Sequence, residues 1–481
     1  MVFSSITFLL YFLPVVFIVY YLLAFSRKLQ NLWLLAGSLF FYAWGEPIYV
    51  VIMLGSIIVN WLLGLAIHRS GDNKRLRKVF MIVACIANLG VLGIFKYTGF
   101  FIEIINSMFG EQVLQDPEIR LPIGISFFTF QALSYVIDVY RGKAQTQKNM
   151  LHLGLYISFF PQLVAGPIVR YTTVQKQILN RKSDWNMISN GVCRFVEGLL
   201  KKILLANNLA IVADNIFELT NYGSTVVEVP VMLAWVGALA YTFQLYYDFS
   251  SYSDMAIGLG MMFGFTFPEN FRYPFVSKSI KEFMARWHIS LATWFNQYVY
   301  KPLGGGQGEN QDRMLRNLLI VWLLTGIWHG AAWNFIWWGL FFFVFIVLEN
   351  LIQIEQIEGH NVLRHIYVIF VVMIAMVIFR CEDNAQLIVY MQDLFGLAGN
   401  GFYSPTAVMF LKEYGIVLVS AILFALPLRE YLEERVDTAA HGKRIKGVYH
   451  ICYVAGMLAL VIFSLSVLAK GGYNPFIYFN F

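Results

Sequence analysis

Long apolar runs separated by short polar segments extend along almost the whole chain. A helix needs about 20 apolar residues to cross a bilayer. The pattern therefore predicts about ten spanning helices. They lie in the ranges Val2–Phe25, Asn31–Ala43, Ile48–Ile67, Val79–Phe101, Leu121–Tyr140, Ile188–Ala213, Val231–Tyr247, Leu363–Phe379, Gly415–Leu428 and Val448–Leu468. The first run is longer than a signal-peptide core and lacks a cleavage motif, so we expect it to be a spanning helix.

Three further apolar stretches are interrupted by glycine, proline or charged residues. They are Leu151–Val169, Asp254–Tyr300 and Leu318–Leu348, the last of which carries His329. Irregular backbone occurs at membrane depth only where protein or a water-filled cavity covers it. We therefore expect the first two stretches to form re-entrant or in-plane helices around a central cavity.

Charged residues between the runs indicate the orientation of the chain, because short cytoplasmic loops are rich in lysine and arginine. Basic segments expected inside are Arg69–Lys78, Arg141–Lys148 and Arg170–Lys182. Acidic segments expected outside are Glu103–Glu118 and Asp214–Glu228, whereas the acidic loop Glu349–Glu358 fits either side. If Leu318–Leu348 is a hairpin that returns to the cytoplasm, the loop Arg429–Lys446 lies inside and both termini lie outside.

The composition agrees with a polytopic membrane protein surrounded by lipid. Hydrophobic residues make up 58% of the 481 residues and charged residues only 13%, whereas soluble domains carry about 25% charged residues. The net charge of +6 includes no long basic run, so it does not indicate nucleic-acid binding. The cysteines show neither metal-ligand nor disulfide spacing, and we expect no metal and buried apolar positions for Cys85, Cys193, Cys381 and Cys452. Without internal repeats or a second soluble domain, residues 1–481 are expected to form a single transmembrane domain.

His329 is the most informative residue, because it is an ionisable group within an apolar segment. Such groups are costly in a membrane and usually functional, and imidazole accepts a proton near neutral pH. The alternative is a structural histidine that forms hydrogen bonds between helices. Gly326 and Gly330, four residues apart, indicate close helix packing, which would also fix the position of His329.

A second histidine, His288, lies in the polar stretch Asp254–Gly306 and, like His329, follows a tryptophan. Two Trp-His pairs beside apolar helices suggest the walls of one cavity. The alternative for His288 is a hydrogen-bonded histidine at the membrane interface. Asp254 and Arg286 belong to the same stretch and are candidate supporting residues.

Together these segments resemble the membrane-bound O-acyltransferase (MBOAT) family, in the branch that acetylates bacterial exopolysaccharides such as alginate. The segments that carry the resemblance occur in the order Met1–Ser5, Pro122–Phe130, Tyr135–Gly142, Phe160–Ile168, Tyr247–Asp254 and the two histidine motifs. The resemblance implies an all-α polytopic integral membrane protein, an MBOAT-type helical bundle. Two departures, Met284-Ala285 in place of Trp-Arg and Asn296-Gln297 in place of Arg-Asp, concern the acceptor side or partner contacts and leave the histidines intact.

By this resemblance, His329 matches the family's near-invariant histidine and His288 its second one, and the reaction is acyl transfer from a thioester to a hydroxyl. A hydroxyl is a poor nucleophile until a base takes its proton, and desolvation favours the neutral imidazole that a base requires. We therefore assign His329 as the base and His288 to orient a substrate or share a proton. Trp328 or Asn334 is expected to hold the ring or the thioester carbonyl.

The chain closes with Pro475-Phe476-Ile477-Tyr478-Phe479-Asn480-Phe481. An aromatic tail can serve as an interfacial anchor. However, Phe-x-Tyr-x-x-Phe resembles the acyl-carrier motif of cell-surface acylation systems. That resemblance implies that residues 471–481 form an extracytoplasmic acyl-carrier tail, in which Tyr478 accepts the acyl group and passes it to an external serine.

The implied protein is a membrane O-acetyltransferase of the bacterial cytoplasmic (inner) membrane. Acetyl-CoA is the expected donor, and the final acceptor is a cell-surface polysaccharide or peptidoglycan. Because the chain has no serine nucleophile elbow, we expect an extracytoplasmic serine-hydrolase-like (SGNH) partner. Lys201-Lys202, on an apolar helix, could meet the phosphates of the donor, but snorkelling to the interface is the preferred interpretation.

Three alternatives remain. The first is D-alanyl transfer to teichoic acid from a carrier protein. The second is a transporter or polymer-export protein in which the histidines relay protons without covalent chemistry, although no inverted repeat supports it. The third is acylation of lipid or protein by another branch of the family.

Overall fold

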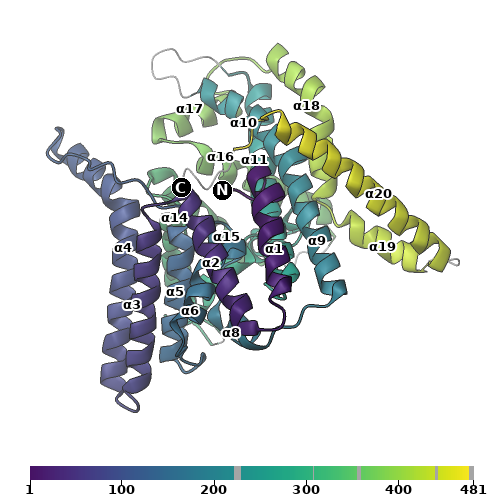
Figure 1. Ribbon diagram of the computed structural model, residues 1–481. Helices are drawn as coiled ribbons and strands as arrows, with labels where there is room; N and C mark the ends of the chain where they lie inside the picture. The colour runs from purple at the N-terminus through teal and green to yellow at the C-terminus, as the bar shows by residue number, and fades with distance from the viewer. Residues whose placement is uncertain (221–228, 307, 355–358, 439–441, 476–481) are drawn as a thin grey trace. The chain divides into compact units, whose positions relative to one another are not determined.

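The computed structural model describes residues 1–220, 229–306, 308–354, 359–438 and 442–475. Within these residues every regular element is a helix (Figure 1). The chain divides into two compact units. The first unit contains Met1–Phe195 and Ser253–Glu269, and the second contains Val196–Tyr252 and, of the described residues, 270–475. Helices α9 and α11 begin in one unit and end in the other.

The first unit is built on long apolar helices, of which α3, α4 and α5 pack against one another. Its elements are η1 (Phe8–Phe12), α1 (Leu13–Leu22), α2 (Arg27–Gly45), α3 (Val50–Arg69), α4 (Lys74–Phe109), α5 (Ile125–Tyr140), α6 (Met150–Ser158), α7 (Phe160–Leu163), α8 (Tyr171–Asn180) and α9 (Trp185–Leu200). The predicted interruption in Leu151–Val169 is confirmed, because the chain breaks between α6 and α7 at Phe159. Pro161 lies in the first turn of α7, where a missing N–H does no harm.

The second unit contains the helices that carry both candidate histidines. Its elements are η2 (Lys201–Ala206), α10 (Asn207–Leu219), α11 (Val231–Met262), η3 (Pro274–Val276), α12 (Ile280–Arg286), α13 (Ile289–Phe295), η4 (Asn296–Tyr300), α14 (Gln311–His329), α15 (Trp333–Ile352), α16 (Asn361–Arg380), α17 (Asn384–Leu394), α18 (Pro405–Phe424), α19 (Leu428–Thr438) and α20 (Gly442–Ala469). Helices α14 and α15 pack tightly as a hairpin, and α16 packs on α15.

Six described helices are long and apolar enough to cross a membrane. They are Val50–Arg69, Lys74–Phe109, Trp333–Ile352, Asn361–Arg380, Pro405–Phe424 and Lys446–Ala469. Two shorter apolar helices, Phe8–Leu22 and Ile125–Tyr140, coincide with further predicted spans. The prediction of an all-α polytopic membrane protein is confirmed, whereas the number of about ten spans stays a prediction.

The boundary predicted after Tyr247 is wrong, because α11 continues as regular helix to Met262. Asp254 therefore lies within a helix, and the irregular stretch begins only after Met262. The serines of this stretch do not interrupt the helix, since a serine hydroxyl can bond to a backbone carbonyl within its own helix. The hydroxyl of Ser251 donates to the carbonyl of Asp248 at 2.9 Å and is fully buried.

Three acidic or basic segments predicted as loops are helical in part of their described residues. Glu349 is a buried residue of α15, Asp214 lies in α10, and residues from 429 to 438 belong to α19. For Asp214 and Glu349 the reason is a partner distant in the chain. The carboxylate of Asp214 pairs with Arg380 at 3.2 Å. Glu349 accepts hydrogen bonds from the backbone N–H groups of Ile280 and Lys281 at 2.5 and 3.1 Å.

Candidate active site

His329 is the last residue of α14 and is buried in an aromatic cage. Its ring centroid lies 5.0 Å from that of Trp328, 4.9 Å from Trp338 and 5.2 Å from Phe379. These rings come from α14, α15 and α16, so three helices fix the position of the imidazole. A neutral ring suits such surroundings, because desolvation disfavours the charged form.

The α14–α15 hairpin brings these rings together by close backbone packing. A Cβ atom at Gly326 would lie 2.3 Å from the carbonyl oxygen of Phe335, and one at Gly339 would lie 2.4 Å from that of Trp322. The predicted close packing through Gly326 is therefore confirmed. Gly330 was predicted to lie on the same helix, but it caps the end of α14 instead. A Cβ atom at Gly330 would lie 2.0 Å from the ring of Phe335. The chain must turn at this point because Trp333 starts the next helix.

His288 occupies the junction between α12 and α13 in the left-handed backbone conformation, with φ of +45°. The amide oxygen of Asn270 lies 3.2 Å from His288 Nδ1 and accepts hydrogen bonds from the N–H and hydroxyl of Ser290. An amide oxygen only accepts, so Nδ1 donates and Nε2 carries the lone pair. His288 lies outside the candidate spans, and burial lowers its pKa, which keeps the ring neutral.

The two histidines flank a single indole. The Trp328 ring centroid lies 6.0 Å from that of His288 and 5.0 Å from that of His329. The structure thus brings together three residues that the sequence singled out, although 41 positions separate the two histidines (329 minus 288). This arrangement defines the candidate active site.

Several buried polar atoms of the second unit have no hydrogen-bond partner among the described residues. Those nearest in sequence to the candidate residues include His288 Nε2, Trp338 Nε1 and Asn334 Oδ1. Buried polar groups are normally paired, so such atoms indicate where a ligand could bind. The Nδ2 group of Asn334 already donates to the carbonyl of Phe379 at 3.0 Å. Its unpaired atom, Oδ1, is an acceptor, whereas the unpaired N–H of Trp338 is a donor that could bond to a thioester carbonyl.

Helix α12, which precedes His288, is held by caps at its N-terminus. Ser279 accepts from the N–H of Glu282, and Glu349 of α15 accepts from two further N–H groups, as described above. Arg286, a predicted supporting residue, forms an ion pair with Glu282 at 2.9 Å and donates to the carbonyl of Arg272. These contacts give Arg286 a role in shaping the segment that carries His288.

Asp254, the other predicted supporting residue, belongs to the first unit. It pairs with Arg194 of α9 at 2.8 Å, and Arg194 also pairs with Glu269 at 2.5 Å. This network joins α9, α11 and the segment after α11. The contacts of Asp254 are thus those of a structural ion pair.

The preferred interpretation of Lys202 is wrong, because this side chain does not snorkel. Only 5% of it is exposed, and Nζ lies 2.6 Å from the carboxylate of Asp248, which is 2% exposed. A partner on α11 therefore keeps the charge inside the protein. The neighbouring Lys201 is half-buried.

The cysteines and the acyl-carrier tail were also predicted from sequence. Cys381 is buried as predicted and Cys85 and Cys193 are half-buried, but the prediction is wrong for Cys452, which is exposed on α20. In the described ranges, no group of three or more His, Cys, Asp and Glu side chains could hold a metal. Tyr478 lies outside the described residues, which end at Pro475.

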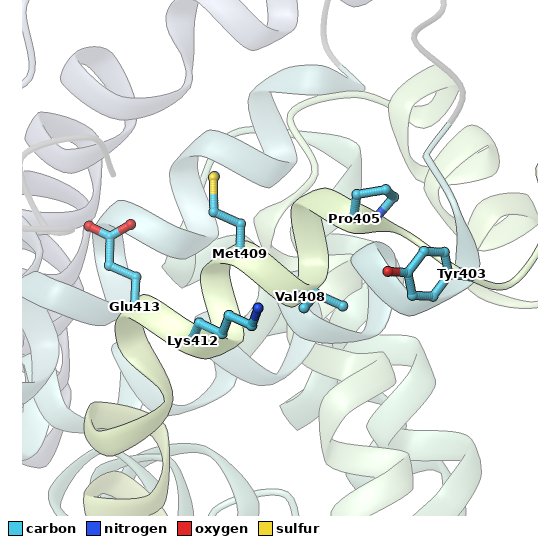
Figure 2. A pocket seen from close by; sticks show the side chains of 6 residues that line it. All are labelled: Tyr403, Pro405, Val408, Met409, Lys412 and Glu413. Carbon is cyan, nitrogen blue, oxygen red and sulfur yellow. The ribbon is translucent and has the colours of Figure 1, made fainter.

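A surface pocket lies at the start of α18 and contains none of the candidate site residues. Figure 2 shows its lining side chains, which are Tyr403, Pro405, Val408, Met409, Lys412 and Glu413. The predicted central cavity stays a prediction.

The helices and the site define a multi-pass membrane protein with a buried pair of histidines. Residues 144–381 match the model of the MBOAT, membrane-bound O-acyltransferase family. The chain belongs to this family, as its motifs predicted, and is an O-acyltransferase.

Two groups of relatives accompany this match. The chain is 38% identical over 447 residues to the "Probable alginate O-acetylase AlgI" of Pseudomonas aeruginosa, which covers 92% of this chain and 84% of the relative. It is 31% identical over 524 residues to the "Peptidoglycan O-acetyltransferase" of Helicobacter pylori, covering 100% and 98%. A "Teichoic acid D-alanyltransferase" of Bacillus subtilis is 28% identical over 243 residues, covering 48% and 59%.

Proposed function

We propose that this protein is a membrane O-acetyltransferase that modifies a cell-surface polysaccharide or peptidoglycan. The names of the relatives that cover most of the chain support this class of acceptor. The observation that carries the proposal is the pair of buried imidazoles on either side of Trp328. They lie beside unpaired buried atoms of both hydrogen-bonding types.

Acetyl-CoA is the proposed donor and the hydroxyl of Tyr478 the proposed first acceptor. His329 takes the phenolic proton as the oxygen attacks the thioester carbonyl. The C–S bond breaks, and the thiolate of coenzyme A leaves and recovers that proton. The net change is acetyl-CoA plus tyrosine giving free coenzyme A plus O-acetyl-tyrosine.

The remaining residues would assist this step. The N–H of Trp338 is the proposed donor to the carbonyl oxygen as negative charge develops, since aligned donors stabilise such oxyanions. The lone pair on His288 Nε2 is free to accept a hydrogen bond from another donor group of a bound substrate and so orient that substrate. Trp328 separates the two imidazoles and fixes both.

Delivery requires a second protein. We propose that residues 471–481 form a carrier tail on the extracytoplasmic side of the bacterial inner membrane. A serine-hydrolase-like (SGNH) partner would take the acetyl group from Tyr478 and transfer it to the polymer hydroxyl. The single transmembrane domain, 1–481, would supply only the step across the membrane.

Intact-mass analysis of the C-terminal peptide, after incubation of purified enzyme with acetyl-CoA, tests the proposal. An acetyl adduct on Tyr478 is expected in the wild type and absent in His329→Ala and Tyr478→Phe. The matched control is His360→Ala, which changes a histidine at the start of α16, away from the aromatic cage. Wild-type enzyme that transfers acetyl to polymer with no adduct on Tyr478 would refute the carrier role.

The D-alanyltransferase relative supports a second candidate, transfer of D-alanine to teichoic acid from a carrier protein. It covers only about half of this chain, so we rank it second. A D-alanyl adduct formed from a charged carrier protein, with none formed from acetyl-CoA, would favour it. Polymer export with no adduct from either donor would favour the transporter instead.

A further inference from the structure

Three residues on the segment η2–α10 contact three consecutive residues that follow α20. The hydroxyl of Tyr473 donates to Asp214 Oδ2 at 2.9 Å, and the side-chain amide of Asn207 donates to Asn474 Oδ1 at 3.2 Å. The ammonium group of Lys202 donates to the carbonyl of Pro475. Tail residues in ascending order therefore meet helix residues in descending order, so the tail runs antiparallel to the helix. Figure 1 shows the end of α20 beside α10.

At Lys202, the backbone carbonyl of Pro475 meets a buried ion pair, which is an unusual environment for a carbonyl. Lys202 and Asp248 form an ion pair whose side chains are 5% and 2% exposed. A buried ion pair is weak evidence for stability, since desolvation offsets its attraction. A lysine ammonium has three protons, which lets Lys202 bind Asp248 and the tail together. The hydrogen bond to Pro475 therefore suggests that this ion pair serves to bind the C-terminal segment.

The other end of the series is connected to the candidate active site through α16. Asp214 Oδ1 accepts from Arg380, the last residue of α16, while its second oxygen accepts from Tyr473. The preceding residue, Phe379, lies against the ring of His329 and accepts from Asn334. Burial raises the pKa of Tyr473 to about 12, so its hydroxyl remains a donor to the carboxylate.

We infer that Asp214, Asn207 and Lys202 form a docking track that positions the C-terminal segment for acyl transfer. The inference rests on the proposed carrier role of Tyr478, which follows Pro475 by three residues. The three are positioning residues, since they bind the tail backbone and side chains next to the carrier and not the acetyl group.

Cross-linking tests the track independently of the chemistry. The full-length pair Asn207→Cys with Asn474→Cys, treated with a short bis-methanethiosulfonate reagent, is expected to cross-link, as read by peptide mass. Asn208→Cys with Asn474→Cys is the matched control, because the side chain of Asn208 bonds within its own helix to Leu204. Equal cross-linking of the two pairs would overturn the track.

Single-turnover acetylation of Tyr478 tests its purpose. Tyr473→Phe and Asn207→Ala each remove one hydrogen bond and are expected to slow the reaction about two- to tenfold. The acetyl-CoA concentration for half-maximal rate should not change, because the proposed track acts on the C-terminal segment and not on the donor. Asn207→Asp combined with Asn474→Lys is expected to restore the rate that Asn207→Asp alone loses, whereas a merely structural role would give no rescue.

The two proposals fail in different ways. If wild-type Tyr478 is acetylated and the track variants keep the wild-type rate, the track has no positioning role. If wild-type Tyr478 is never acetylated, although the Cys pair cross-links, the carrier function is wrong and the track is only an anchor for the chain end.

Discussion

Removing the charge of Lys202 should destabilise the second unit far more than removing a charge usually does. Lys202→Met leaves the carboxylate of Asp248, which is 2% exposed, without its counter-ion inside the protein. Breaking a buried pair in this way costs roughly 3–5 kcal/mol, and losing the bond to Pro475 adds about 1 kcal/mol. Replacing both partners, in Lys202→Met with Asp248→Leu, should cost much less, because no unpaired charge remains.

Thermal unfolding in detergent, followed by tryptophan fluorescence at one fixed scan rate, measures this difference. At about 2–4 °C per kcal/mol, Lys202→Met should unfold at least roughly 6 °C below the wild type. The double variant should recover most of that loss. Lys201→Met is the matched control, since it removes the neighbouring, half-buried charge from the same helix.

Either of two results would refute the reasoning. Lys202→Met that unfolds within the error of the wild type would mean that the pair is hydrated and not buried. A double variant as unstable as Lys202→Met would mean that packing around η2 and α11, and not an uncompensated charge, determines the loss.

Three further predictions concern the hairpin and the support of His288. Gly326→Ala should force the backbones of α14 and α15 apart, which should lower stability in thermal melts by about 1–3 kcal/mol and reduce acetylation. Gly415→Ala is the control and should do neither, because a Cβ atom at Gly415 meets open space. Asn270→Ala should release His288 and lower kcat without changing KM for the donor, whereas Asn270→Asp keeps the acceptor oxygen and should retain more activity. Glu349→Gln should weaken the cap of α12 and lower the melting temperature; an unchanged melt would show that the cap contributes nothing.

The hairpin and both histidines could be predicted because their signals are local. An ionisable residue in an apolar run, and glycines at helical spacing, are visible within a few positions of His329. Asn270 and Trp338 could not be assigned in this way. Asn270 acts on a residue 18 positions away, and the importance of Trp338 depends on which of its atoms remains unpaired.

Charged residues in apolar surroundings were the main source of error. Sequence alone suggests that such a residue reaches water, as predicted for Lys202, or belongs to a loop, as predicted for Glu349. Both instead have partners distant in the chain, Asp248 on α11 and the start of α12, 69 positions away. A single sequence contains no measure of which distant segments meet, so these partners were not predictable.

The closest approaches between α14 and α15 are those of glycines to main-chain carbonyls, and some residues of α15 take no part in them. Val344 and Leu348 of α15 are 47% and 45% exposed and touch whatever surrounds the protein. Their size and shape can therefore change to suit a thicker, thinner or more fluid bilayer while the cage around His329 keeps its dimensions. Adaptation to a new lipid composition and preservation of the chemistry thus act on separate sets of residues.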